Sequence, residues 1–199
     1  DRLCRALDVS AVNPSSLIVK ICGITSPEDA ALAIEAGADW IGLNRWPGSP
    51  RFVDAKAAST LAAFIRERSD RAKIVTLHVD PEIDELAAEV RLLRPYYLQV
   101  HHDRWCVPRV ENVPVLRVFG VDRPEDFAAV GSWPHDPVIL DAKVEGLRGG
   151  TGRRIDPALL VDWKRPYLLA GGLTPENVEE AVRLIRPFGV DVASGVERA

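Results

Sequence analysis

Short, mostly β-branched apolar runs recur along the chain, and most are followed by turn residues and an amphipathic helical pattern. Runs of this length fit buried strands, whereas apolar positions spaced three and four residues apart indicate helices with one buried face. Strands that alternate with helices are typical of βαβ units. The eight predicted strands are residues 17–22, 39–43, 73–78, 96–100, 114–118, 137–141, 167–170 and 190–193.

The helical patterns between these strands have well-marked starts. At Ser26, Asp80 and Thr174 a residue that often caps helices precedes a proline, and acidic residues follow, where the helix dipole favours them. We therefore expect a helix to begin after each of these three residues. The predicted helices are residues 27–36, 54–68, 81–93, 124–130, 156–163 and 175–186, with a weak pattern near 103–107.

This alternation favours one α/β fold, a small closed (β/α)8 TIM barrel, over an open sheet. Only residues 194–199 follow the eighth predicted strand, so the eighth helix is expected to be missing. Leu3 and Leu7 recur at helical spacing. We expect residues 1–16 to be an extension, in which a helix over 1–9 covers the seam between the last and first strands, and residues 17–199 to form the barrel. An unpacked tail is the alternative.

Composition narrows the class of protein. The 199 residues are 47% hydrophobic and 27% charged with a net charge of −4, which fits a globular domain and excludes a disordered or collagen-like chain. An acidic chain without an apolar run of spanning length predicts neither nucleic acid nor a membrane as a partner, but a small polar ligand. Three irregularly spaced cysteines favour a reduced, cytoplasmic protein. Monomer and homodimer both stay open.

Two reactive residues end predicted strands at the face where barrel enzymes hold their catalytic groups. Cys22 ends the first strand and Asp141 ends the sixth. A thiolate can act as a general base, and a carboxyl group in a partly dry pocket can stay protonated and act as an acid. Such a pair suits an isomerisation that moves protons. The alternatives are a buried apolar filler for Cys22 and a cap for Asp141.

Glycine-rich segments after the last strands indicate a phosphate site. Gly171-Gly172 follows the seventh predicted strand and Ser194-Gly195 follows the eighth, where barrels often bind phosphate through backbone N–H groups. Gly150 lies within a glycine-rich loop after the sixth strand, between arginines, and we expect that loop to fold over a ligand. Ordinary turns are the alternative for each of these segments.

Charged residues near the same face complete the candidates. Arg51 follows the second strand and suits a substrate carboxylate, unless it is a solvated surface residue. His101 and His102 form the cluster that most resembles a metal site, but adjacent strand residues point in opposite directions, so we expect no metal. Lys20 lies on the face of Cys22, where it could lower the thiol pKa, and we expect it to pair with Asp191 inside the barrel.

Read in order, a series of motifs from Ile18 to Glu197 resembles the phosphoribosylanthranilate isomerase family of tryptophan biosynthesis. The motifs are KICGIT at 20–25, SPR at 49–51, LDAK at 140–143, GGTG at 149–152, LAGGL at 169–173 with PENV at 175–178, and VDV through SGVE at 190–197. The resemblance implies a small (β/α)8 barrel that carries out an Amadori rearrangement without a metal or cofactor.

The resemblance also implies roles. Asp141 matches the family's general acid, which protonates the furanose ring oxygen, and Cys22 matches the general base, which removes the C2′ proton. Arg51 matches the residue that faces the anthranilate carboxylate, and the phosphate loops match Gly171, Gly172, Ser194 and Gly195. Arg45 and His102 depart from the family pattern and could narrow or recharge the pocket. A related phosphosugar isomerase and a non-catalytic phosphosugar-binding barrel are the alternatives.

Overall fold

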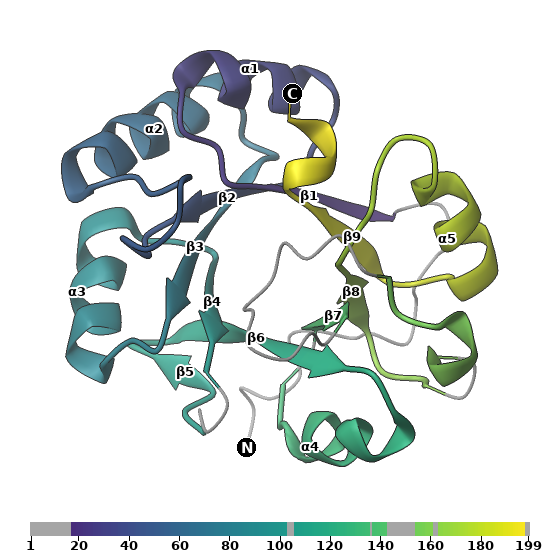
Figure 1. The fold of residues 1–199 in the computed structure, drawn as a ribbon. Helices are drawn as coiled ribbons and strands as arrows, with labels where there is room; N and C mark the ends of the chain where they lie inside the picture. Colours follow the sequence, from purple (N-terminus) through teal and green to yellow (C-terminus); the bar gives the residue numbers. More distant parts are fainter. Residues whose placement is uncertain (1–16, 103–105, 136, 143–153, 161–162, 198–199) are drawn as a thin grey trace.

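The computed structural model describes residues 17–102, 106–135, 137–142, 154–160 and 163–197. Eight parallel strands close into a barrel, because β4 pairs with β6 and β1 pairs with β9 (Figure 1). This confirms the predicted (β/α)8 TIM-barrel class. The strands are β1 Ile18–Cys22, β2 Trp40–Asn44, β3 Lys73–Val79, β4 Tyr97–His101, β6 Val113–Val121, β7 Val138–Ala142, β8 Tyr167–Leu169 and β9 Gly189–Val192.

Helices surround the barrel and cover its outer face (Figure 1). They are α1 Pro27–Glu35, α2 Ala55–Arg68, α3 Ile83–Leu93, α4 Phe127–Ser132 and α5 Val178–Ile185, with short 3-10 helices at η2 Pro124–Asp126, η3 Pro157–Leu160 and η4 Ser194–Val196. Ile41 and Leu43 of β2 pack under α1 and α2 and are fully buried. Within the described ranges, no helix has the length and apolar character that crossing a bilayer requires.

The barrel interior changes from apolar to polar along its axis. Near the amino ends of the strands, large side chains fill the interior as a packed layer: Trp40, Val75, Tyr97, Leu116, Ile139 and Leu168, each at most 5% exposed. Above this layer the inward positions carry Lys20, Asp191, Gln99 and Asp141. Because the lower interior is closed by side chains, the functional groups are confined to the carboxyl ends of the strands.

Two of the three predicted helix starts need correction. Ser26 caps α1 as predicted, accepting a hydrogen bond from the Asp29 N–H, but α3 is capped by Glu82 and α5 by Asn177. The chain is still turning after Asp80, which has a φ of 47°, so the helix cannot begin there. Likewise, a turn occupies residues 175–177, and α5 begins three residues later than expected.

The segment between β4 and β6 contains a hairpin that the sequence did not predict. The weak helical pattern near residues 103–107 lies mostly outside the described residues, and after it β5 (Arg109–Val110) pairs antiparallel with β6. Glu111 and Asn112 at its tip both have positive φ, as a two-residue type I′ turn requires. The proposed helix over residues 1–9 and the Gly150 loop lie outside the described residues, and β9 is followed by η4.

Candidate active site

A cavity of about 240 Å³ lies at the carboxyl ends of the barrel strands and brings most of the predicted site residues together. Its lining includes Cys22, Arg51, Asp141, Gly171, Gly172, Ser194 and Gly195. These residues come from opposite sides of the barrel and from both ends of the chain, so only the closed fold assembles them. Gly150 lies outside the described residues.

Cys22 is at the end of β1 and is only 9% exposed. The neighbouring strand makes room for it, because a Cβ on Gly42 would lie 2.8 Å from the Cys22 sulfur. Burial raises the pKa of the Cys22 thiol, while the charges of Lys20 and Arg51 oppose that rise and the charge of Asp191 adds to it. The thiol therefore depends on nearby cations for access to its thiolate form.

Asp141, near the end of β7, is the group best suited to donate a proton in this cavity. Burial raises the pKa of its carboxyl group to about 6, and the negative charge of Asp191 adds to this, whereas a hydrogen bond from the Ala142 backbone opposes it. Its buried Oδ1 has no hydrogen-bond partner among the described residues. A carboxyl group with a pKa near neutrality and an uncommitted oxygen can act as a general acid.

Lys20 and Asp191 form the ion pair that the sequence predicted. The two residues are register partners on β1 and β9, and Lys20 Nζ lies 2.6 Å from Asp191 Oδ1. The Lys20 side chain is 0% exposed and that of Asp191 is 9% exposed, so the pair lies at the buried base of the cavity. A buried pair of this kind stays charged because each partner compensates the other.

Arg51 extends from the loop between β2 and α2 toward the cavity. Asn44 at the end of β2 donates a hydrogen bond to Ser49 Oγ (3.0 Å), which accepts another from the Arg51 N–H (3.1 Å), so the loop is held at its base. The Arg51 guanidinium binds the Glu197 carboxylate through two nitrogens, with Nη2 2.7 Å from Oε2. A carboxylate in this bidentate position shows the geometry that arginine offers to an acidic ligand. Sequence reasoning did not identify Glu197.

The two glycine-containing loops meet beside this face. Gly171 and Gly172 both adopt positive φ, and a Cβ on Gly195 would overlap the Leu173 carbonyl oxygen. Asn177 ties the first loop together, since its side chain donates to the Gly172 carbonyl (2.9 Å) and accepts from the Thr174 N–H (3.0 Å). Backbone N–H groups in such loops can approach a phosphate closely.

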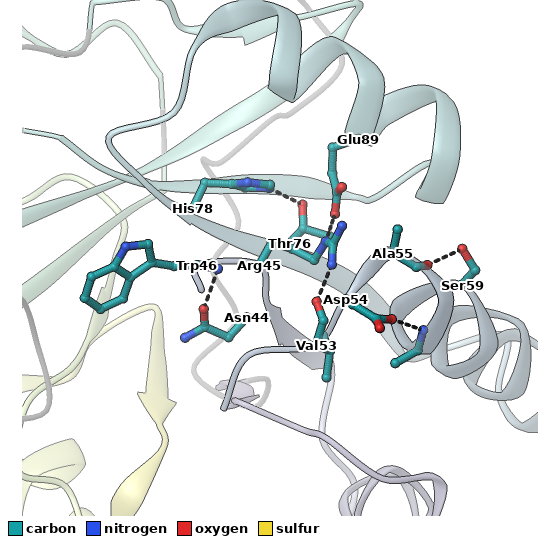
Figure 2. A network of polar contacts seen from close by, with 11 residues as sticks. Asn44, Arg45, Trp46, Val53, Asp54, Ala55, Ser59, Thr76, His78 and Glu89 are labelled. Carbon is teal, nitrogen blue, oxygen red and sulfur yellow. Dashed lines mark hydrogen bonds and ion pairs between the residues drawn. The ribbon is translucent and has the colours of Figure 1, made fainter. Parts of the chain in front are cut away.

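Arg45 does not recharge the cavity, contrary to the expectation from sequence. Its side chain points away from the cavity toward α3, where Nε lies 2.8 Å from Glu89 Oε1, and a second nitrogen binds the Val53 carbonyl (Figure 2). His78 lies next to this pair, and burial together with the charge of Arg45 lowers its pKa to about 3, so it is neutral. The Arg45 network thus joins both ends of the loop that carries Arg51.

His101 lines the cavity, whereas His102 is not part of the lining and its carbonyl accepts a hydrogen bond from Arg117 (3.4 Å). The two imidazoles are therefore not brought together at the cavity. Gln99, which sequence reasoning missed, also lines it, is 2% exposed and lies 3.1 Å from His101 Nε2 through its Nε2 atom. Across the described ranges, no group of three or more histidine, cysteine or acidic residues is placed to hold a metal ion.

The fold and the cavity together define a small (β/α)8-barrel enzyme equipped for acid–base chemistry. A family model described as N-(5′-phosphoribosyl)anthranilate (PRA) isomerase matches residues 19–199. The chain therefore belongs to the N-(5′-phosphoribosyl)anthranilate isomerase family, whose members are isomerases.

Individual relatives agree with this assignment. N-(5′-phosphoribosyl)anthranilate isomerase of Magnetococcus marinus is 39% identical over 184 residues, which cover 91% of this chain and 86% of the relative. The crystal structure of phosphoribosyl anthranilate isomerase from Thermotoga maritima has a TM-score of 0.83 at 30% identity, covering 92% of this chain and 91% of that one. A second crystal structure, of the isomerase with reduced 1-(o-carboxyphenylamino)-1-deoxyribulose 5-phosphate, has a TM-score of 0.80 at 29% identity, with coverage of 92% and 90%.

Proposed function

We propose that this chain converts N-(5′-phosphoribosyl)anthranilate to 1-(o-carboxyphenylamino)-1-deoxyribulose 5-phosphate in tryptophan biosynthesis, with Asp141 as general acid and Cys22 as general base. Membership of the isomerase family supports the reaction. The observation that carries the residue roles is the shared cavity, in which a buried thiol and a carboxyl group of raised pKa both line the same space.

The first step is opening of the furanose ring. Asp141 gives its proton to the ring oxygen, the bond from C1′ to that oxygen breaks, and the lone pair of the anthranilate nitrogen forms the C=N bond of a protonated Schiff base. The raised pKa of Asp141 supports this role, because a carboxyl group that titrates at about 6 retains a protonated fraction near neutral pH. Its Oδ1 makes no competing hydrogen bond within the described part of the chain.

The second step is proton removal from C2′. The Cys22 thiolate takes this proton, the C–H electrons form the C1′=C2′ double bond, and the C=N electrons return to nitrogen, which gives an enolamine. Return of a proton to C1′ and loss of the enol proton yield the ketone, so the overall change is an isomerisation. Side chains carry both proton transfers, and the proposed chemistry therefore uses no cofactor. A reduced Cys22 is required, which agrees with a cytoplasmic location.

Two groups of residues orient the phosphorylated substrate in this proposal. Arg51 binds the anthranilate carboxylate, which takes a position like that of the Glu197 carboxylate on the guanidinium. The phosphate binds the loops that contain Gly171, Gly172 and Ser194. Gly150, the remaining predicted substrate-binding residue, lies outside the described residues.

The experiment that tests the proposal follows the loss of substrate fluorescence when freshly generated N-(5′-phosphoribosyl)anthranilate is mixed with the protein. We expect Cys22→Ala and Asp141→Asn each to reduce the rate at least 100-fold while binding of the product persists, because a proton-transfer group contributes about 10²- to 10⁴-fold. Cys106→Ala is the matched control, since Cys106 is an exposed free cysteine.

Each alternative has its own signature in this assay. Wild-type-like rates in either variant contradict the residue roles. If the wild type binds the product but leaves the substrate at its spontaneous decay rate, the chain is a non-catalytic phosphosugar-binding barrel. Turnover of aminoaldose phosphates that lack the anthranilate ring, without turnover of the anthranilate compound, indicates a related isomerase of altered specificity.

A further inference from the structure

We propose that Lys20 is a positioning residue for Cys22: its buried ammonium group, held in place by Asp191, stabilises the thiolate that accepts the substrate proton. This inference rests on the proposed role of Cys22 as general base. It assigns to the ion pair at the base of the cavity a part in the reaction in addition to its part in the fold. The group that acts on the substrate remains Cys22, and Lys20 acts through it.

The position of Lys20 supports this assignment. Lys20 and Cys22 are two residues apart on β1, so both side chains project from the same face of the strand into the barrel. The lysine side chain is 0% exposed, and its Nζ lies 2.6 Å from Asp191 Oδ1. An ammonium group has three N–H donors, and no water reaches a fully buried one, so it needs protein acceptors besides one carboxylate oxygen. The Cys22 sulfur lies at the next inward position of β1, and the charge of each group favours the ionised form of the other.

The other charges that face Cys22 do not replace Lys20. Asp191 on β9 is negative and disfavours a thiolate, and Asp141 on β7 lines the same cavity with a further carboxyl group. Arg51 is positive, but its effect on the Cys22 pKa is smaller than that of Lys20, and Glu197 already binds its guanidinium. The adjacent strand β2 presents Gly42 to Cys22 and adds no charge there. Lys20 is therefore the main cationic support of the thiolate.

The arrangement predicts opposite effects for the two members of the ion pair. Replacing Lys20 with an uncharged residue leaves the thiol beside the Asp191 carboxylate without its main cation, so the Cys22 pKa rises. Replacing Asp191 with asparagine leaves the Cys22 thiolate as the remaining anion that can compensate the buried ammonium, so the Cys22 pKa falls. If the ion pair only supported the fold, replacing Lys20 and replacing Asp191 would not shift the Cys22 pKa in opposite directions.

The test measures the rate at which iodoacetamide alkylates Cys22 between pH 6 and pH 10. The parent protein is the 199-residue chain with Cys4→Ser and Cys106→Ser, so that Cys22 is its one cysteine. This rate follows the thiolate fraction and needs no isomerase activity. We expect Lys20→Gln to move the alkylation profile to higher pH, so that below the thiol pKa the rate at a given pH falls roughly tenfold if the pKa rises by one. Asp191→Asn is expected to move the profile to lower pH, and Lys20→Arg to stay near the parent profile.

Unchanged profiles in folded Lys20→Gln and Asp191→Asn, or movements in the same direction, overturn the proposal. Circular dichroism establishes that each variant is folded. If Lys20→Gln does not fold because it leaves Asp191 buried and unpaired, the Lys20→Gln/Asp191→Asn double variant removes both charges. The direction in which Asp191→Asn alone moves the alkylation profile then still decides whether the proposal holds. If the variants move the profile as expected but the parent protein does not isomerise the substrate, the proposed function is contradicted and the Lys20–Cys22 coupling stands.

Discussion

We predict that the charged form of Asp141 destabilises the folded protein at neutral pH. The free energy of unfolding of an Asp141→Asn variant measures this effect. The Asp141 carboxyl pKa of about 6 lies well above its ordinary value of 3.8, because burial disfavours the charged form. A pKa difference of one corresponds to about 1.4 kcal/mol, so ionising Asp141 in the folded state costs about 3 kcal/mol more than in the unfolded chain. The asparagine variant should thus be inactive and more stable than the wild type.

The sign of the pH dependence follows from the same raised pKa. Between pH 3.8 and about 6 the folded protein binds the Asp141 proton more tightly than the unfolded chain does, so this group's contribution to stability falls as the pH rises through that window. It is fully present below the lower value and lost above about pH 6. The stability gain of Asp141→Asn over wild type is therefore expected to be largest near pH 7.5 and to shrink toward pH 4.5.

Equilibrium urea unfolding of both proteins at pH 4.5 and pH 7.5 gives the required double difference, in which other titrating groups cancel. Asp122→Asn serves as the matched control, because Asp122 is exposed. A gain of about 1–3 kcal/mol at pH 7.5 that falls at pH 4.5 is the expected result. If the variant is no more stable than wild type at pH 7.5, or gains equally at both pH values, burial of the Asp141 charge does not destabilise the protein and the reasoning is refuted.

Three further perturbations test other parts of the site. Glu89→Gln breaks an ion pair whose side chains are 6% and 13% exposed and should lower the free energy of urea unfolding by about 3–5 kcal/mol. Glu35→Gln, in an exposed pair, should change it by less than about 1 kcal/mol. Similar losses would mean that burial does not determine how much these ion pairs stabilise the protein. Gly195→Ala should raise the inhibition constant of inorganic phosphate at least about tenfold, because the new Cβ overlaps a backbone carbonyl. Gly131→Ala is the control and should leave the constant unchanged, because the space around Gly131 is open. An unchanged constant in Gly195→Ala would mean that this loop is not part of the phosphate site. Arg51→Ala should weaken binding of the anthranilate substrate by about 1.5–3 kcal/mol, which raises KM about 10- to 100-fold, and should leave inhibition by inorganic phosphate unchanged. Equal losses of affinity for substrate and phosphate would assign Arg51 to the phosphate instead.

The barrel and its strand ends could be predicted because each depends on local pattern. Cys22 and Asp141 both lie at the ends of apolar runs, and the topology of parallel strands brings such ends to one face. The Lys20–Asp191 pair could be predicted for a related reason, since the two-residue period of a strand places Lys20 inside the barrel and closure makes β9 its neighbour.

Features that depend on contacts distant in sequence could not be predicted in this way. Glu197 binds Arg51 across 146 positions, and nothing in the pattern around either residue indicates the other. Arg45 looked like a pocket residue because it follows a strand, but the acceptors that draw it outward, Glu89 and Val53, become visible only when α3 packs against the loop. The helix starts at Asp80 and Thr174 were misplaced because a turn intervenes, and the structure places the caps at later residues.

The packed layer of side chains beneath the cavity limits how substrate and product reach and leave the site. Trp40, Leu116 and Leu168 close the barrel below Lys20 and Asp191, so the described part of the chain offers no passage along the barrel axis toward the amino ends of the strands. Along the barrel axis, substrate and product therefore enter and leave at the carboxyl ends of the strands, so the product has to clear this end of the cavity before the next substrate binds. Water that could hydrolyse the proposed open-chain intermediate does not come through the packed layer either, so the bound substrate itself obstructs its approach along the axis.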